Sequence, residues 1–263
     1  MLDRLYGSNL QILPALTDEK VLPAYPSSAH TPPPPTDLST SVAPVDVESS
    51  HIPLVDDLGI HAYCLQLLST WGHLMSYTRR IKDGDIETPW APNSAYQNLV
   101  AEMCQFETAL PEVHRFRLAR FQDRSMAELE AHCQYWTPWL FLQFIYHGIR
   151  GLMNHPLFHL VRAEERQSGR SPSFSQHVID QAILHSGWVI FMIDTCEEKS
   201  FLVKDPFIGH LVAITATIYV FLTSSKDEAL SSKARRAFDK CFAFVEVMAA
   251  QWDHLRHTVR KPL

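Results

Sequence analysis

The spacing of hydrophobic residues after position 55 follows the period of an α-helix. In the first such stretch, apolar side chains recur every three or four residues, at Leu58, Ala62, Leu65, Leu68 and Trp71. This spacing predicts one amphipathic helix, because residues three and four apart share a helix face. We expect Asp56 or Asp57 to cap its start, and the Lys-Asp-Gly-Asp sequence at 82–85 to end it.

Two further helices are predicted to begin at serine caps. Ser94 precedes Gln97 by three residues, and Ser125 precedes Glu128 by the same spacing, which is the pattern of a capping box. The first of these helices should run to Leu110-Pro111. The second should run through an aromatic stretch to the Asn-His-Pro sequence at 154–156, and Pro138 should kink or divide it, since proline lacks an amide donor.

Three more helices are predicted in the rest of the chain. After a polar loop at 162–172, one helix should be capped by Ser173 or Ser175, and the last should run from about Ser231 to Thr258. No alternating pattern of a β-strand is found anywhere. The predicted fold class is therefore all-α, an irregular multi-helix bundle with a Pro-rich N-terminal linker.

The helix between these two, Pro206 to Ser225, is uncharged over twenty residues, which is long enough to cross a bilayer. It also carries His210 and several hydroxyl side chains, and its flanks show no one-sided excess of Lys or Arg. We therefore interpret it as a helix buried by other helices, with no membrane contact.

The N-terminal region differs in composition from the rest and divides the chain into three parts. Residues 1–22 are interpreted as the tail of a helix and a connection, residues 23–53 as a partly disordered Pro-rich linker, and residues 54–263 as a helical regulatory domain. Seven prolines fall between Pro23 and Pro44, which excludes helix and central strand there.

Composition narrows the function classes. The chain has 263 residues, 46% of them hydrophobic, and a net charge of −6. A free-standing DNA-binding protein is more often basic, so direct DNA binding by this chain alone is not expected. Its five cysteines form no CxxC pair, so we interpret them as structural thiols in a protein of a reducing compartment. The N-terminus lacks the pattern of a signal peptide.

Candidate metal and catalytic sites were sought among the fourteen histidines. The nearest approach to a cluster is His132, His147, His155 and His159, but no HExxH motif is present and Pro156 breaks the helix that would align them. No GxSxG, GxGxxG or Walker-type motif occurs either. We therefore expect no metal, no cofactor, no catalytic residues and no enzymatic activity.

The aromatic stretch of the third helix has two possible interpretations. Core packing is the simpler one, but such side chains also line pockets in helical domains, so a small-molecule pocket stays open. The candidate pocket residues are Tyr135, Trp136, Trp139, Phe144 and Tyr146.

Several short motifs together resemble the fungal-specific transcription factor domain, the middle homology region of the Zn2Cys6 zinc-cluster regulators. They are the Leu-Asp-Arg at 2–4 with the proline-containing segment at 13–23, and the motif Trp90-x-Pro92-x-Ser94-x-x-Gln97-x-Leu99 that continues to Phe106-Glu107-x-x-Leu110-Pro111. Tyr146-His147, His155-Pro156-Leu157 and Trp252 also fit the family pattern. The resemblance covers most of the chain and corresponds to the C-terminal part of the family domain.

This resemblance implies a nuclear regulatory module that binds a small-molecule effector or a regulatory protein. The family binds DNA through a six-cysteine zinc cluster, which is absent here, as are the coiled-coil linker and the Gly-Arg/Lys-Pro that follows Asp-Arg in the family. A truncated gene product and a stand-alone regulator both stay open. The alternative from another class is an unrelated helical metabolite-binding protein or enzyme, with a cytoplasmic location.

Overall fold

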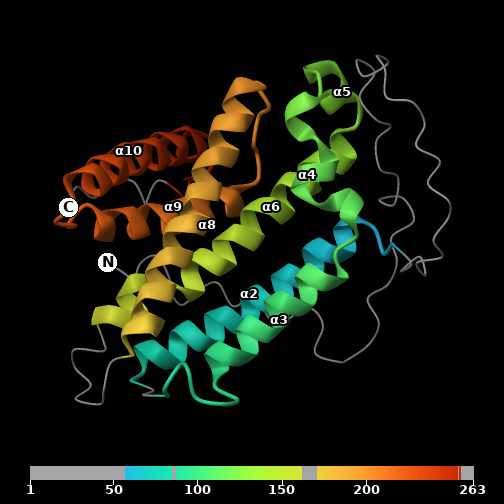
Figure 1. Cartoon of the computed structure of the whole chain (residues 1–263). Helices are drawn as coiled ribbons and strands as arrows, with labels where there is room; N and C mark the ends of the chain where they lie inside the picture. Colours follow the sequence, from blue (N-terminus) through green and yellow to red (C-terminus); the bar gives the residue numbers. More distant parts are fainter. Residues whose placement is uncertain (1–56, 85–86, 162–170, 254, 256–263) are drawn as a thin grey trace, which may run out of the picture.

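The computed structural model describes residues 57–84, 87–161, 171–253 and 255 (Figure 1). The predicted helix tail at 1–22, the Pro-rich linker at 23–53 and most of the polar loop at 162–172 lie outside the described residues.

The described residues form an all-α fold, as predicted, and contain no β-strand. The α-helices are α2 (Ile60–Lys82), α3 (Ala95–Ala109), α4 (Phe116–Ala119), α5 (Met126–Ala131), α6 (Cys133–Met153), α8 (Pro172–Glu198), α9 (Pro206–Leu222) and α10 (Glu228–Gln251). Short 3₁₀ turns, η3 (Glu112–His114) and η4 (Phe121–Asp123), connect α3 to α5, and a π-helical turn, η5 (Leu157–Val161), follows α6.

The two serine caps are at the predicted positions. The Ser94 hydroxyl accepts from the Gln97 N–H at 3.2 Å, although only this half of the predicted capping box is formed. Ser125 and Glu128 form the complete box, each side chain accepting from the other residue's backbone N–H. Local sequence alone is sufficient for these caps, because both partners lie within one turn.

Of the other four predicted helix starts, the one at Pro206 is confirmed and three are wrong. Helix α2 begins after Gly59, because the Asp57 carboxylate accepts from the Gly59 N–H and from a histidine ring and does not cap the helix. Helix α8 begins after Ser171, since Pro172 takes the first helical position, where its missing N–H costs nothing. Helix α10 begins after Asp227, whose carboxylate accepts two backbone N–H groups.

The third predicted helix is divided, but not at proline. The break lies at His132, which separates α5 from α6. Pro138 is the sixth residue of α6 and lies inside the helix. There it removes one backbone hydrogen bond just after the first turn, and the helix continues past it to Met153.

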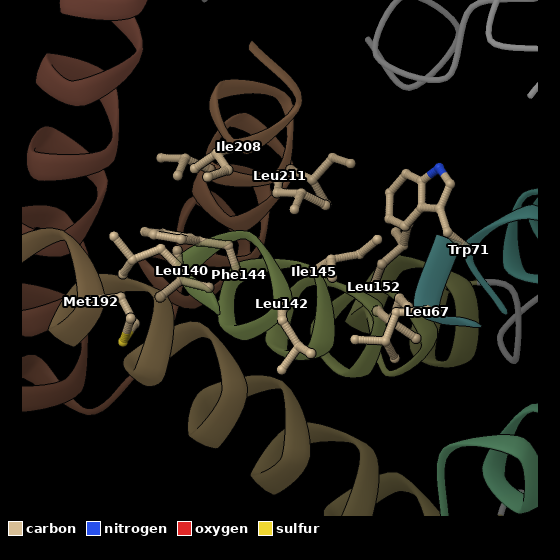
Figure 2. Packing of buried hydrophobic residues seen from close by; sticks show 14 of the residues in the cluster. Leu67, Trp71, Leu140, Leu142, Phe144, Ile145, Leu152, Met192, Ile208 and Leu211 are labelled. Carbon is tan, nitrogen blue, oxygen red and sulfur yellow. The ribbon is translucent and has the colours of Figure 1, made fainter. Parts of the chain in front are cut away.

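Helix α6 is the centre of the bundle and contacts α2, α8 and α9. Most of its side chains are buried, and Figure 2 shows residues of all three neighbours gathered around Leu140, Phe144 and Ile145. Its approach to α9 is close: a Cβ on Gly148 would lie 2.8 Å from the Leu211 Cδ2. Glycine at this position lets the two helices pack directly against each other.

Helix α9 is buried as the sequence predicts. Its 17 residues are all buried or half-buried, and it is covered by α6 on one side and α10 on the other (Figure 1). Helices α6, α8 and α10 thus supply the apolar surroundings that its uncharged sequence requires. Among the described residues, no helix meets the length and apolarity of a membrane span.

Candidate functional site

An apolar groove of about 310 Å³ lies where the end of α8, the connection to α9 and one side of α10 meet. This size falls at the lower end of the range for small-ligand pockets. The residues that line it are Ile193, Cys196, Glu197, Ser200, Phe201, Leu202, Val203, Ala243, Phe244, Val247 and Met248.

The floor of the groove is shaped by the way α8 ends. Ser200 adopts a left-handed conformation, with φ 53°. Its N–H bonds the Glu197 carbonyl, and the Phe201 N–H bonds the Cys196 carbonyl, which together form a Schellman motif. This motif turns the chain away from the α8 axis, so that residues 201–203 run beside α10.

Two apolar side chains that line the groove are largely exposed to solvent. Leu202 in the connection is 55% exposed and Val247 on α10 is 59% exposed, and both line the groove. On α10, Phe242 and Trp252 are each 39% exposed, and the Trp252 indole N–H donates to the Lys204 carbonyl at the end of the connection. Exposed apolar side chains that line a groove are typical of a binding region.

The charges at the groove are paired within the protein. Lys240 bridges Asp194 and Glu197, and the hydrogen bond from its ammonium to Asp194 raises the pKa of Lys240. Burial, and then the charge of Glu197, raise the pKa of the Cys196 thiol to about 12. The thiol is therefore protonated at neutral pH and is a poor nucleophile. The groove is suited to apolar contact and not to covalent chemistry.

The five predicted pocket residues lie elsewhere, and none of them lines the groove. Trp136, Trp139 and Phe144 are at most 1% exposed. The Trp139 ring stacks on Phe121 at 5.4 Å, and its indole N–H donates to the His114 carbonyl at 2.8 Å. These side chains form the core that the simpler interpretation predicted, and ligand binding by them stays a prediction.

Tyr135 belongs to a buried chain of hydrogen bonds. Its hydroxyl lies 2.9 Å from the His114 Nδ1, and the His114 Nε2 lies 2.9 Å from an Asp57 carboxylate oxygen. Burial lowers the pKa of His114 more than Asp57 raises it, so the imidazole is neutral. Asp, His and a hydroxyl in this order resemble a catalytic relay. Tyr135 is only 5% exposed, however, which leaves a substrate little access to its hydroxyl.

Tyr146 belongs to a group of polar side chains that links α3 to α6. Its hydroxyl donates to the Glu107 carboxylate at 2.8 Å, and Arg150 pairs with the same carboxylate. Burial alone would raise the pKa of Glu107, but hydrogen bonds from Arg150 and Tyr146 outweigh it and lower the pKa. The carboxylate is therefore charged and already satisfied, which suits a structural role better than acid–base chemistry.

Beside this polar group, His147 of α6 and His185 of α8 bond each other directly, with the two Nδ1 atoms 2.9 Å apart. Trp188 stacks on the His147 ring at 5.1 Å. Burial first, and then the facing His185 and Arg150, lower the pKa of His147 well below its usual value. Burial and Arg150 lower the pKa of His185 to about 4, and together they outweigh Glu107, which raises it. Both rings are therefore neutral at pH 7.

The histidines considered as metal ligands do not converge on one site, and His155 and His159 each bond a different group of the protein. His155 lies 2.9 Å from the Thr217 hydroxyl, and His159 lies 2.7 Å from the Met153 carbonyl. In the described part of the chain, no group of three His, Cys, Asp or Glu residues is placed to hold a metal ion.

Sequence reasoning did not find the groove. Val247 lies off the apolar stripe of α10 that the spacing predicts, and Leu202 lies in a connection. An apolar residue outside its helix stripe was the available signal, and it is a weak one because single exposed apolar residues are common.

Comparisons with known proteins found no matching family model, no matching curated protein and no matching solved structure.

Proposed function

We propose that this chain is the regulatory portion of a fungal zinc-cluster-type transcription regulator. It acts in the nucleus by binding an effector or a partner protein in the groove between α8 and α10, without direct contact to DNA and without catalysis. The motif resemblance around positions 90–111 and 146–157 supports the class of regulator. The groove supports the mode of action.

The observation that carries the proposal is the exposure of Leu202 and Val247. A side chain of this kind contributes about 1.5–3 kcal/mol when it passes from water into an apolar contact. Two of them face a groove that the chain itself leaves open. Because each side chain is a little over half exposed, an apolar ligand or the apolar face of a partner helix would gain about half of that free energy on binding.

A reporter experiment tests this proposal. The full 263-residue chain is fused to a heterologous DNA-binding domain in yeast, and transcription from its target promoter is measured. We expect the fusion to change reporter output relative to the DNA-binding domain alone, and Val247→Asp to abolish that change. When the ligand or partner protein binds, the new carboxylate would have to give up its water in an apolar contact, which is costly because no hydrogen-bond donor replaces the water.

The matched control is Val113→Asp, the same substitution at a valine that is 42% exposed in η3, outside the groove. Both positions are exposed, so each variant should change the free energy of unfolding by about 0.5 kcal/mol or less. Val113→Asp should keep the reporter effect. A wild-type fusion with no effect, or a Val247→Asp fusion that acts like wild type, would contradict the proposal.

A further inference from the structure

The contact between His147 and His185 has a fixed arrangement of protons. The His185 Nε2 lies 3.3 Å from the Gln181 side-chain oxygen, which accepts, so Nε2 carries the hydrogen. In a neutral His185 the Nδ1 is then an acceptor. The His147 Nδ1 must therefore carry its hydrogen and donate across the helix interface.

This arrangement tolerates one added proton but not two. A proton on the His147 Nε2 leaves the bond between the two Nδ1 atoms intact. A second proton can only enter at the His185 Nδ1, and it would turn the acceptor into a donor. Two N–H groups would then face each other at 2.9 Å, on two cationic rings with centroids 5.2 Å apart.

The surroundings do not compensate for two positive charges. Arg150 of α6 is itself cationic and disfavours a proton on either ring. Glu107 of α3 favours a proton on His185, but burial and Arg150 outweigh it, and its carboxylate is already bonded by Arg150 and Tyr146. From α9, the Tyr219 phenol lies near Ser186, next to His185, and burial raises its pKa to about 12, so it is uncharged. Trp188 of α8 covers one face of His147.

We infer that the His147–His185 contact is an acid-sensitive device: it holds α6 and α8 together while both imidazoles are neutral and separates them when both are protonated. The device lies at a main interface of the bundle, since α8 packs chiefly against α6. The freed imidazoles have the ordinary pKa of 6.5, so opening takes up protons below that pH.

The test follows the opening of α8 through thiol accessibility. Cys196 of α8 is 3% exposed. Cys64 of α2 is also buried, but its thiol bonds the Pro138 carbonyl of α6, so it reports on the contact between α2 and α6. The exposed Cys104 and Cys133 are replaced by serine in the full chain. A pyridyl disulfide, which reacts with thiols at acidic pH, labels each site, and mass spectrometry gives each rate relative to the unfolded chain.

Each proton taken up on opening makes opening about ten times more favourable per pH unit, so two protons give about a hundredfold. We expect the relative labelling rate at Cys196 to be constant above pH 6.5. Below pH 6.5 the rate should increase as the pH falls, and the increase should approach about a hundredfold per pH unit. The rate at Cys64 should rise less than the rate at Cys196. A constant rate at Cys196, or a parallel rise at Cys196 and Cys64, would overturn the inference.

Variants isolate the pair from the other histidines. Asparagine places an amide where Nδ1 stood and does not titrate, so His147→Asn with His185→Asn should remove the rise at Cys196. If the double variant does not fold, His185→Asn alone should reduce the slope to about tenfold per pH unit. His73→Asn, at a ring that is 54% exposed and bonds Glu102, is the control and should keep the wild-type profile. A wild-type slope in His185→Asn contradicts the inference.

Discussion

Buried histidines in this bundle are held in single tautomers by their neighbours. The Leu157 N–H donates to the His155 Nδ1 at 3.2 Å, so the His155 Nε2 carries the hydrogen and donates to the Thr217 hydroxyl. That hydroxyl donates in turn to the Ile214 carbonyl at 2.6 Å. Burial, and then the nearby His159, lower the pKa of His155 to about 3, so this chain of bonds is intact at neutral pH.

Thr217→Val should therefore destabilise the protein. Valine keeps the shape of threonine but leaves the buried His155 Nε2–H without its acceptor, which costs about 1–3 kcal/mol. The measurement is the free energy of unfolding in urea at pH 7.

The control for this prediction is Thr108→Val. Thr108 is an exposed helical threonine whose hydroxyl bonds only to the carbonyl of the preceding turn, at Cys104. Its replacement should change stability by about 0.5 kcal/mol or less. Equal effects of the two substitutions would show that the His155 bond contributes nothing.

Backbone strain at Ser200 leads to a second prediction. A left-handed conformation costs a residue with a Cβ roughly 1–2 kcal/mol, and glycine avoids this cost. Ser200→Gly should therefore raise the free energy of unfolding by about 1 kcal/mol, measured as a higher urea midpoint.

The same substitution at Ser224 should act in the opposite direction. Ser224 lies in the turn after α9, and its φ is not among the positive values of the described chain. Glycine there only adds freedom to the unfolded state, which costs roughly 0.5–1 kcal/mol. A destabilised Ser200→Gly variant would mean that the serine side chain holds the turn by contacts that outweigh the strain.

At the scale of elements, the burial of α9 governs the stability of the bundle. Ile214 is 1% exposed, and α9 is enclosed between α6 and α10. Ile214→Asp would place an unpaired charge in this interior, and we expect a loss of stability of several kcal/mol, on the order of the whole stability of a domain. Thermal unfolding followed by circular dichroism measures the change.

Leu184→Asp provides the matched control, because Leu184 is 50% exposed on α8. Its aspartate stays in water, so the melting temperature should be nearly that of wild type. If Ile214→Asp melted at the wild-type temperature, α9 would not be central to the fold.

At the scale of the whole molecule, the net charge of −6 bears on nucleic-acid binding. Protein–DNA affinity derives largely from basic side chains that neutralise phosphates, and an acidic chain repels the duplex. We therefore expect the isolated 263-residue chain to retain no specific DNA site at nanomolar concentration in an electrophoretic shift assay. Sequence-specific retention that survives 200 mM salt would overturn this prediction.

The helical class, the burial of α9 and the caps at Ser94 and Ser125 could be predicted from the amino-acid sequence. Each of these rests on residues within a few turns of one another, or on the apolar character of a whole segment. The predicted start of α2 was wrong for the opposite reason. Asp57 could have capped a helix, but it bonds His114, which lies 57 residues further along the chain.

The positions of the candidate sites depend on which helices pack against each other. The groove requires α8 and α10 to meet, which brings Lys240 to Asp194 across 46 residues. The His147–His185 contact spans 38 residues and depends on the rotation of both α6 and α8 about their axes. Periodicity predicts which face of a helix is buried but not which other helix covers it, because many apolar partners provide nearly the same hydrophobic free energy.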